Sequence, residues 1–424
     1  MRAVAEDPKK ELWETGIGHA FGTSDPALEP KLDEWMAQHP EHFAPYLARG
    51  SYFAARGYAQ RGGAFLDETT RGQVAAMTHS LERARADLDR ALRLQPRSIA
   101  TRAALIHVGQ SIGGDVHALL ASALEVCPTC LSIRITAMHA LRPRWGGSVE
   151  AMRQLANDAQ AHASENPRLR VLLGYPDWEA CQSQATDQEE GPYDLAPCER
   201  ALAHGAHWDF FYARAHMHGR LEHFDEQAAD VERVLEQRPF YVYALRTRTR
   251  LLGREQRWVD AADVLLTRLR LDPNEALRDH EWVCHGLRFE GWKRIQRNDR
   301  EAAVRHHDAY RRIAPTDPRV GALLQGIGQM PPADAVEAAE NAVQERPDDI
   351  AALIALDAMW MRLARADDVI EMWDGYIERH PNDGRAHYER AGTHHHAGNA
   401  EQSMNDVRRA CDLGHQPACT RVGR

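Results

Sequence analysis

Cysteines and histidines are the residues of this chain whose types could support chemistry. The sequence "CPTC" at 127–130 has the Cys-x-x-Cys spacing of thioredoxin-like redox sites and of half a zinc site. A redox site of that kind lies beside a βαβ pattern, and a zinc site needs a second pair at matching spacing. The chain shows neither, so we expect 127–130 to form a turn between two helices.

Histidine is abundant, with 23 residues that include "HHH" at 394–396 and "HMH" at 216–218. Neighbouring histidines on a helix point in different directions, so such a run does not build a tetrahedral metal site. The triple run falls where one helix of a pair turns into the next. We expect a solvated turn there, and no metal or cofactor.

The stretch "PRWGGS" at 143–148 invites comparison with a nucleophile elbow. That motif needs Gly-x-Ser-x-Gly on a strand-to-helix turn, and neither the second glycine nor a preceding strand is present. A helix boundary fits instead, because the proline ends one helix, the glycines permit left-handed turns and Ser148 can cap the next helix. The alternative is a ligand contact by Arg144 or Trp145.

The elements that must position these residues follow a repeat. In the C-terminal half, a proline closes each pair of amphipathic stretches with helical spacing. No strand-like alternation occurs, so the fold class is predicted to be all-α. The closing prolines are Pro239, Pro273, Pro315, Pro347 and Pro381, and small residues suited to helix crossings are Ala261, Gly291, Ala303, Ala335 and Ala391.

These features resemble the tetratricopeptide-repeat (TPR) family, whose unit is a 34-residue helix-turn-helix with small residues in both helices and a closing proline. The resemblance covers about residues 206–417, although the Trp-x-x-Leu-Gly signature is degenerate. It implies an α-solenoid of stacked antiparallel helix pairs. The longer gap between Pro273 and Pro315 implies that the helix starting near "NEALRDHEWVCHG" is extended.

The N-terminal half reads as less regular helix pairs and carries a second resemblance. The sequences "YLARG" at 46–50, "AARG" at 54–57 and "PRWGGS" resemble an uncharacterised bacterial family of TPR-like proteins, over about residues 40–165. No activity comes with that resemblance. The polar stretch "SQATDQEEGPYD" at 183–194 is the predicted linker between an irregular TPR-like domain at 1–182 and a repeat domain at 195–424.

Cysteine usage bears on the compartment. Seven cysteines is an odd number, and the first residues lack a basic-then-apolar signal sequence. We therefore predict a cytoplasmic protein without an all-disulfide framework; the alternative is a periplasmic or secreted protein whose leader was removed. The segment around Cys411 and Cys419 resembles cysteine-paired helical repeats related to TPRs, which implies a bridge between these two cysteines if the protein is exported.

Composition narrows the class of partner. The chain has 424 residues, 43% hydrophobic and 27% charged, with a formal net charge of -10 and no apolar run long enough to cross a bilayer. An acidic balance argues against a dedicated nucleic-acid binder, because phosphate binding needs a basic field. We expect a soluble protein with a protein or peptide partner, no nucleic acid and no membrane.

Threading the TPR register assigns the residues that would line a concave groove. Arginines pair with carboxylates and aromatic faces offer stacking area, so these positions predict a basic, aromatic groove. The alternative is that they are ordinary solvated or interhelix residues. The predicted binding residues are Tyr212, His216, Tyr243, Arg246, Arg250, His285, Arg288 and Trp292, with Asp209 at an equivalent place and apolar Ile354 and Ala358 in the following repeats.

Together these features predict a non-catalytic scaffold for protein–protein interaction that binds an acidic or extended peptide segment. No catalytic constellation survives inspection, so the chain is not expected to be an enzyme. The alternative function is a small-molecule, metal-dependent or thiol-dependent activity that uses the histidine-rich and cysteine-rich turns. A purely structural role in assembly is the third possibility.

Overall fold

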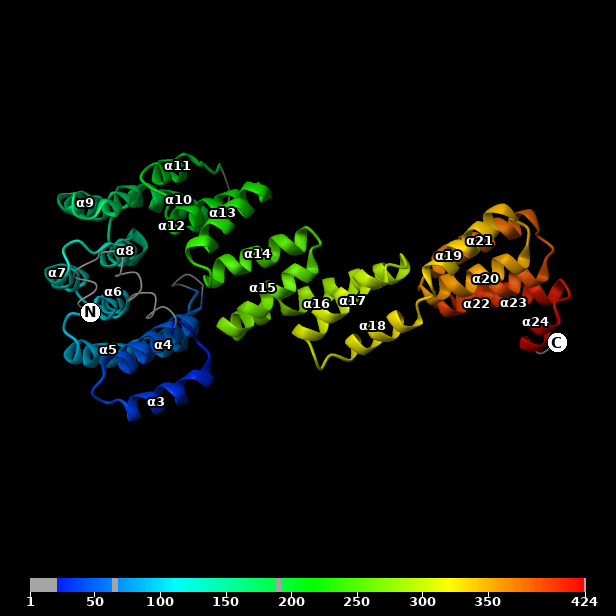
Figure 1. Ribbon diagram of the computed structural model, residues 1–424, viewed down its shortest axis with the longest axis horizontal. Coiled ribbons are helices and arrows are strands. Elements are labelled where there is room, and N and C mark those ends of the chain that lie inside the picture. The colour runs from blue at the N-terminus through cyan, green and yellow to red at the C-terminus, as the bar shows by residue number, and fades with distance from the viewer. Residues whose placement is uncertain (1–20, 63–67, 188–191, 423–424) are drawn as a thin grey trace. The chain divides into compact units, whose positions relative to one another are not determined.

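A computed structural model describes residues 21–62, 68–187 and 192–422 (Figure 1). Throughout these ranges the secondary structure is helical and contains no strand, which confirms the predicted all-α class. The chain divides into two compact units. Unit 1 comprises residues 1–251 and 267–278, and unit 2 comprises residues 252–266 and 279–424.

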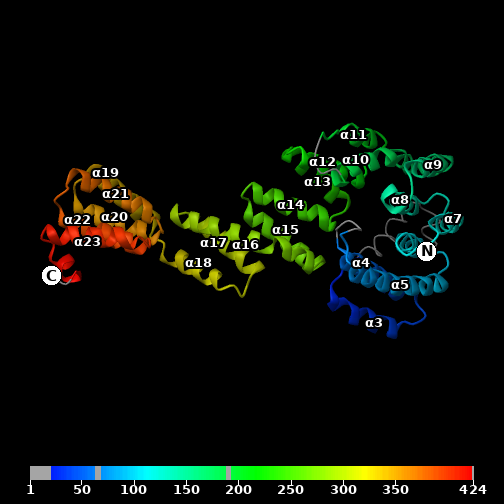
Figure 2. The same cartoon turned by 180° about the vertical axis from the view of Figure 1, so that it is seen from behind.

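Unit 1 is built from helix pairs in which consecutive helices pack side by side, as α4 with α5, α6 with α7 and α12 with α13. Both Figure 1 and Figure 2 show α4 lying along α5. The helices are α3 (Glu29–Gln38), α4 (Phe43–Arg61), α5 (Arg71–Leu94), α6 (Ile99–Gly109), α7 (Val116–Val126), α8 (Leu131–Ala140), α9 (Val149–Ala159), α10 (Tyr175–Asp187), α11 (Ala196–Ala203), α12 (Trp208–Arg220) and α13 (Phe224–Gln237), with 3-10 turns at Pro26–Leu28, Pro143–Trp145, Gln160–His162 and Pro167–Gly174.

The glycines of "YLARG" and "AARG" explain the close packing of α4 on α5. A Cβ atom added at Gly50 would lie 2.8 Å from Cγ of Leu88, and one added at Gly57 would lie 3.2 Å from the carbonyl oxygen of Met77. Because glycine has no Cβ, the two helices can approach at these points. The two motifs therefore mark a helix crossing.

The "PRWGGS" corner is a helix boundary. The Ser148 side chain accepts a hydrogen bond from the backbone N–H of Ala151 at 3.1 Å and so caps α9, as predicted. The left-handed residue is Gly146, with φ of 86°. Gly147 is needed for a different reason: an added Cβ there would lie 2.1 Å from the carbonyl oxygen of Leu141.

Unit 2 continues the helix pairs. Its α16 (Pro273–Gln296, from residue 279 on) is long, which confirms the extended helix predicted from the 42-residue gap. The other helices are α17 (Arg300–Ile313), α18 (Pro318–Gln329), α19 (Ala333–Glu345), α20 (Ile350–Arg362), α21 (Ala366–Arg379), α22 (Gly384–His396), α23 (Ala400–Asp412) and α24 (Gln416–Arg421), while α14 (Val242–Arg254) and α15 (Trp258–Leu271) contribute residues to both units.

Small residues occupy the helix crossings of unit 2. Ala261, Ala303 and Ala391 are fully buried, and Ala335 is half-buried. A Cβ added at Gly291 would lie 2.9 Å from Cδ2 of Leu323, so this glycine admits α18 against α16. The burial of Ala261, Gly291, Ala303 and Ala391 agrees with the repeat pattern, whereas Ala335 is less buried than predicted.

The predicted linker at 183–194 is not where the chain divides. Residues 183–187 belong to α10, and residues 188–191 lie outside the described ranges. Helix α10 packs against both α11 and α12, and a disulfide joins Cys181 to Cys198 across this stretch. Polar composition signalled a surface loop here, but the helices on either side of it pack together.

The cysteines depart from expectation. Three disulfides form, Cys127–Cys130, Cys181–Cys198 and Cys411–Cys419, and they use six of the seven cysteines of the chain. The seventh, Cys284, is a buried thiol. Cys127–Cys130 joins the end of α7 to the start of α8, so the "CPTC" segment is a turn between helices as predicted, although its thiols are bonded. Among the described residues, no helix is both long and apolar enough to cross a membrane.

Candidate functional site

Five aromatic rings gather at the start of α14 and along α12 in unit 1. We call this group the aromatic row. Tyr212 lies one helical turn before His216, with ring centroids 4.4 Å apart, and its other side meets Tyr241 at 5.0 Å. Tyr241 also contacts Trp208 at 5.0 Å and Tyr243 at 5.6 Å, in both cases edge to face. The row therefore consists of Trp208, Tyr212, His216, Tyr241 and Tyr243.

The row is partly open to solvent. Tyr243 is 53% exposed, while Tyr212, His216 and Tyr241 are half-buried. Phe240, directly before the row, is 69% exposed. Aromatic rings that pack edge to face hold one another in place. The surface thus offers preformed aromatic contact area whose side chains lose little freedom when a partner binds.

Sequence threading found three members of the row and missed two. Tyr212, His216 and Tyr243 occupy predicted lining positions. Trp208 is the first residue of α12 and Tyr241 directly precedes α14, so neither falls on a lining position of the repeat. The sequence feature that could have identified Trp208 and Tyr241 is that each follows a turn and lies at the start of a helix, where its ring can pack across the neighbouring helix.

Asp209 follows Trp208 in the chain, but it is buried and does not line the row. Its side chain is only 4% exposed, and its carboxylate accepts hydrogen bonds from the Tyr175 hydroxyl at 2.6 Å and the His139 ring at 3.0 Å. The Trp178 indole N–H donates to the backbone carbonyl oxygen of Asp209 at 3.1 Å. The prediction that Asp209 faces a groove is wrong, because its partners on α8 and α10 draw it inward.

Neighbouring side chains outweigh burial in setting the pKa of Asp209. Burial by itself would raise the pKa of Asp209, but attraction to His139, the hydrogen bond from that ring and the proximity of His207 together lower the pKa to about 2. Burial and the neighbouring Asp209 carboxylate raise the pKa of the Tyr175 hydroxyl well above its usual range. At neutral pH Asp209 is therefore an ionised carboxylate that accepts a hydrogen bond from the un-ionised phenol of Tyr175.

The row itself is uncharged at neutral pH. Burial, helped by repulsion from Arg220, lowers the pKa of His216 to about 4. Burial also raises the pKa of Tyr241 far above its usual range. Both side chains are thus neutral at pH 7 and present ring faces without net charge.

Two of the predicted arginines share a helix face with the exposed tyrosine. Tyr243, Arg246 and Arg250 are spaced three and four residues apart on α14, which places them on one side of that helix. Arg246 is half-buried and Arg250 is exposed. Five of the eight predicted site residues therefore lie in unit 1.

The other three predicted residues belong to unit 2, on α16. His285 is exposed and stacks on Phe289, with centroids 6.2 Å apart and ring planes at 15°, and Arg288 is half-buried. Trp292 packs against α18, since a Cβ added at Gly326 would lie 2.7 Å from its ring. Trp292 therefore lies between helices, which was the alternative to its predicted place in a groove.

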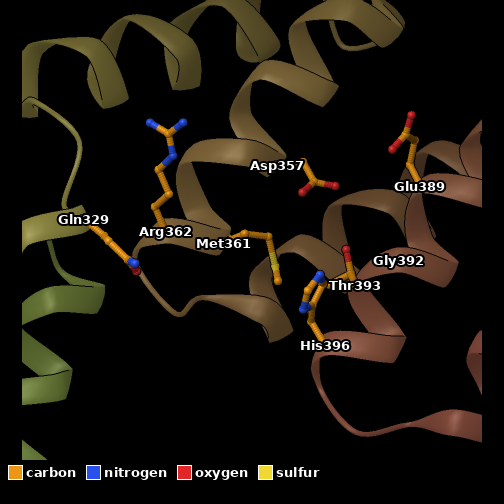
Figure 3. Close-up of a pocket in the computed structure, with 8 residues that line it drawn as sticks. All are labelled: Gln329, Asp357, Met361, Arg362, Glu389, Gly392, Thr393 and His396. Carbon is orange, nitrogen blue, oxygen red and sulfur yellow. The ribbon is translucent and has the colours of Figure 1, made fainter. Parts of the chain in front are cut away.

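A pocket lies in unit 2, in repeats where sequence threading placed only apolar lining residues. The end of α18, α20 and α22 border an open pocket of about 400 Å³ (Figure 3). Ile354 and Ala358, the positions predicted from the repeat, do not line it. The lining residues are Gln329, Asp357, Met361, Arg362, Glu389, Gly392, Thr393 and His396.

The histidine run ends α22 and does not form the following turn. His396 is exposed and lines the pocket of unit 2, while His394 lies with its Nε2 atom 3.9 Å from the Asp406 carboxylate. In the part of the chain that the structure describes, no group of three or more His, Cys, Asp or Glu side chains is arranged to hold a metal ion.

No family model matches the chain, and no curated protein does. The resemblance to a bacterial family at "PRWGGS" therefore stays a prediction. The solved structures it is similar to include the TPR domain of P58(IPK), at 11% identity over 83% of this chain and 97% of that one, with a TM-score of 0.28.

Human IFIT1, solved as a dimer with PPP-AAAA, is 14% identical over 82% of this chain and 92% of that one, with a TM-score of 0.26. Yeast Tom70 is 11% identical over 93% and 94%, with a TM-score of 0.23. Because these scores are below 0.5, no argument about the site rests on them. The all-α helical-repeat fold is established by the paired helices of the chain itself.

Proposed function

We propose that this chain is a non-catalytic scaffold for protein–protein interaction, and that unit 1 binds an extended, acidic segment of a partner protein. The observation that carries the proposal is the aromatic row, in which five rings pack on one another along α12 and at the start of α14. Aromatic side chains that are held in place and are still partly exposed are typical of a binding surface, because their exposed apolar area is unfavourable in water and becomes favourable when a partner covers it.

The acidic character of the segment follows from Arg246 and Arg250. A guanidinium pairs with a carboxylate through two parallel hydrogen bonds, so these side chains favour glutamate or aspartate. The rings of the row carry no charge at pH 7 and take the apolar or aromatic side chains that alternate with the acidic ones. An extended segment meets both requirements, because its successive side chains point in opposite directions.

The test uses a fluorescein-labelled peptide of alternating glutamate and valine, with the full oxidised chain, followed by fluorescence anisotropy. We expect Tyr243→Ala and Tyr212→Ala each to weaken binding about tenfold, or about 1.4 kcal/mol. Phe289→Ala is the matched control, since Phe289 is 54% exposed in unit 2 and Tyr243 is 53% exposed in unit 1. The control should leave the affinity within about twofold.

Two outcomes would contradict the proposal. If an oligoadenylate RNA competes with the peptide at lower concentration than unlabelled peptide does, the surface prefers nucleic acid. If Phe289→Ala weakens binding as much as Tyr243→Ala does, the peptide recognises exposed aromatic residues in general and not the row.

We also propose that the chain matures in an oxidising compartment, in place of the cytoplasm predicted from the odd number of cysteines. The three disulfides support this proposal, because such bonds persist mainly outside reducing compartments. A thiol-dependent activity would have to use Cys284, whose thiol is buried. Alkylation of protein taken directly from its cells, in denaturant without reductant, tests the compartment: six or seven labelled cysteines would contradict it.

A further inference from the structure

We propose that the pocket of unit 2 is a second binding site, which takes a cationic side chain, a lysine or an arginine of an extended peptide, between the carboxylates of Asp357 and Glu389. This site lies in the other unit and takes the opposite charge, so it does not depend on the function proposed for the aromatic row.

Neighbouring helices supply the two carboxylates. Asp357 comes from α20 and Glu389 from α22, and both line the same pocket (Figure 3). The buried Trp373 indole N–H donates to Oδ2 of Asp357 at 2.7 Å, which fixes that carboxylate and leaves Oδ1 as an acceptor. Glu389 has one ionic neighbour among the described residues, Arg385, at 3.6 Å.

The negative charge of Glu389 acts on Asp357. Burial raises the pKa of Asp357, and the hydrogen bond from Trp373 opposes this effect. The negative charge of Glu389 raises the pKa further, and His396 lowers it. A carboxylate whose ionisation a neighbouring negative charge disfavours is stabilised when a cation lies beside it. The charges of the pocket therefore favour a positively charged guest near Asp357 and Glu389.

A threonine in the lining suits the same guest. Thr393 is only 3% exposed and lines the pocket. Its hydroxyl oxygen can accept a hydrogen bond from a guest. An ammonium or guanidinium group carries several N–H donors, and its bonds to the two carboxylates leave others available for the threonine oxygen.

The remaining wall suits the stem of a lysine or arginine. Met361 offers a flexible apolar side chain along which methylene groups can lie, in the way that long cationic side chains cover apolar surface. A Cβ added at Gly392 would meet no atom within 4 Å, so this glycine leaves open space. Arg362 also lines the pocket, and its charge would turn the cationic end of a guest toward the two acids.

The experiment measures fluorescence anisotropy of a labelled decapeptide of alternating lysine and serine with the full oxidised chain. We expect Asp357→Asn and Glu389→Gln each to weaken binding about fivefold or more, since each removes one charge-assisted contact. Gly392→Leu should weaken it about tenfold without any change of charge, because the new side chain fills the open space.

Matched control variants distinguish binding in the pocket from non-specific attraction of the peptide to a negatively charged chain. Glu371→Gln removes one negative charge from an exposed position in unit 2, and Gly321→Leu makes the same steric change on α18 where an added Cβ also meets nothing within 4 Å. Both should stay within about twofold of wild type. Circular dichroism and thermal melting verify that each variant is folded.

Three results would overturn the proposal. One is unchanged affinity in Asp357→Asn and Glu389→Gln, and another is equal loss in Glu371→Gln. The third is tighter binding of the matching glutamate–serine peptide than of the lysine–serine peptide. If Gly392→Leu fails to fold, the two charge variants still decide the matter, because amides keep the size of the carboxylates that they replace.

Discussion

Arg390 and Asp406 meet in a two-point ion pair, with the guanidinium Nε 2.8 Å from Oδ2 and Nη2 2.7 Å from Oδ1. Arg214 and Asp230 repeat this arrangement at 2.8 Å for both contacts and at the same sequence separation of 16. In each case the arginine lies on the first helix of a pair and the aspartate on the second. The bond ties the two helices of a repeat together.

Removal of the aspartate should therefore destabilise a repeat. Asp230 is buried, and Asp230→Ala leaves the partly buried Arg214 guanidinium without its main partner, at a cost of about 1 to 3 kcal/mol. Urea denaturation measures this. Glu232→Ala is the control, because its ion pair with Arg248 is exposed and should contribute less than about 1 kcal/mol. Equal losses would show that Asp230 does not tie the pair.

The stability of unit 1 should fall in mild acid. Burial lowers the pKa of His207 to about 4, below the value of about 6.5 in an unfolded chain. Between these values the unfolded chain binds the proton and the folded chain does not, so the stability that the neutral ring confers is present above pH 6.5 and lost as the pH falls toward 4. Thermal melts from pH 7 to pH 4 measure the slope.

A substitution at His207 tests how much of this pH dependence of stability comes from that histidine. His207 caps α12 by accepting a hydrogen bond from the N–H of Asp209, and asparagine can cap in the same way. His207→Asn should therefore keep the helix and flatten the pH dependence. His204→Asn, at an exposed position on the same loop, should keep the wild-type slope. A His207→Asn slope equal to that of wild type would contradict the assignment.

The helix boundary at "PRWGGS" makes a steric prediction. Gly147→Val should destabilise unit 1 by about 1 to 3 kcal/mol, because even its Cβ would lie 2.1 Å from the carbonyl oxygen of Leu141 and the backbone must move. Ser148→Ala should cost about 1 kcal/mol through loss of the cap on α9. Denaturant titration compares both with wild type. If both variants unfold at the wild-type midpoint, the boundary is not fixed by these two residues.

The disulfides predict a specific thiol count. Native protein should react with iodoacetamide at no cysteine, because burial raises the pKa of the Cys284 thiol to about 12. Denatured protein without reductant should take up one label, and reduced protein seven. Mass spectrometry reads each number. Reduction should also lower the free energy of unfolding by about 2 to 4 kcal/mol for a bond such as Cys181–Cys198.

The structural features that were predicted correctly are those that depend on the residue pattern within one helix or a pair of helices. The extended α16, the cap at Ser148 and the small residues at helix crossings all follow from spacing along one or two helices. The burial of Asp209 could not be predicted in this way, because its partners His139 and Tyr175 lie 70 and 34 residues earlier in the chain. Asp357 was missed because the repeat register pointed to Ile354 and Ala358 on the same helix. Glu389 was missed because no lining position was assigned on α22.

The central claim is that a partner segment lies against the aromatic row, and site-specific photo-crosslinking tests it most directly. A benzophenone amino acid is placed at Tyr243 in one protein and at Phe289 in another, two exposed aromatic positions of similar accessibility. Each is irradiated with the labelled glutamate–valine peptide. We predict a crosslink from position 243 that excess unlabelled peptide abolishes, and none from position 289. A crosslink from position 289 alone, or equal crosslinks from both, would contradict the account.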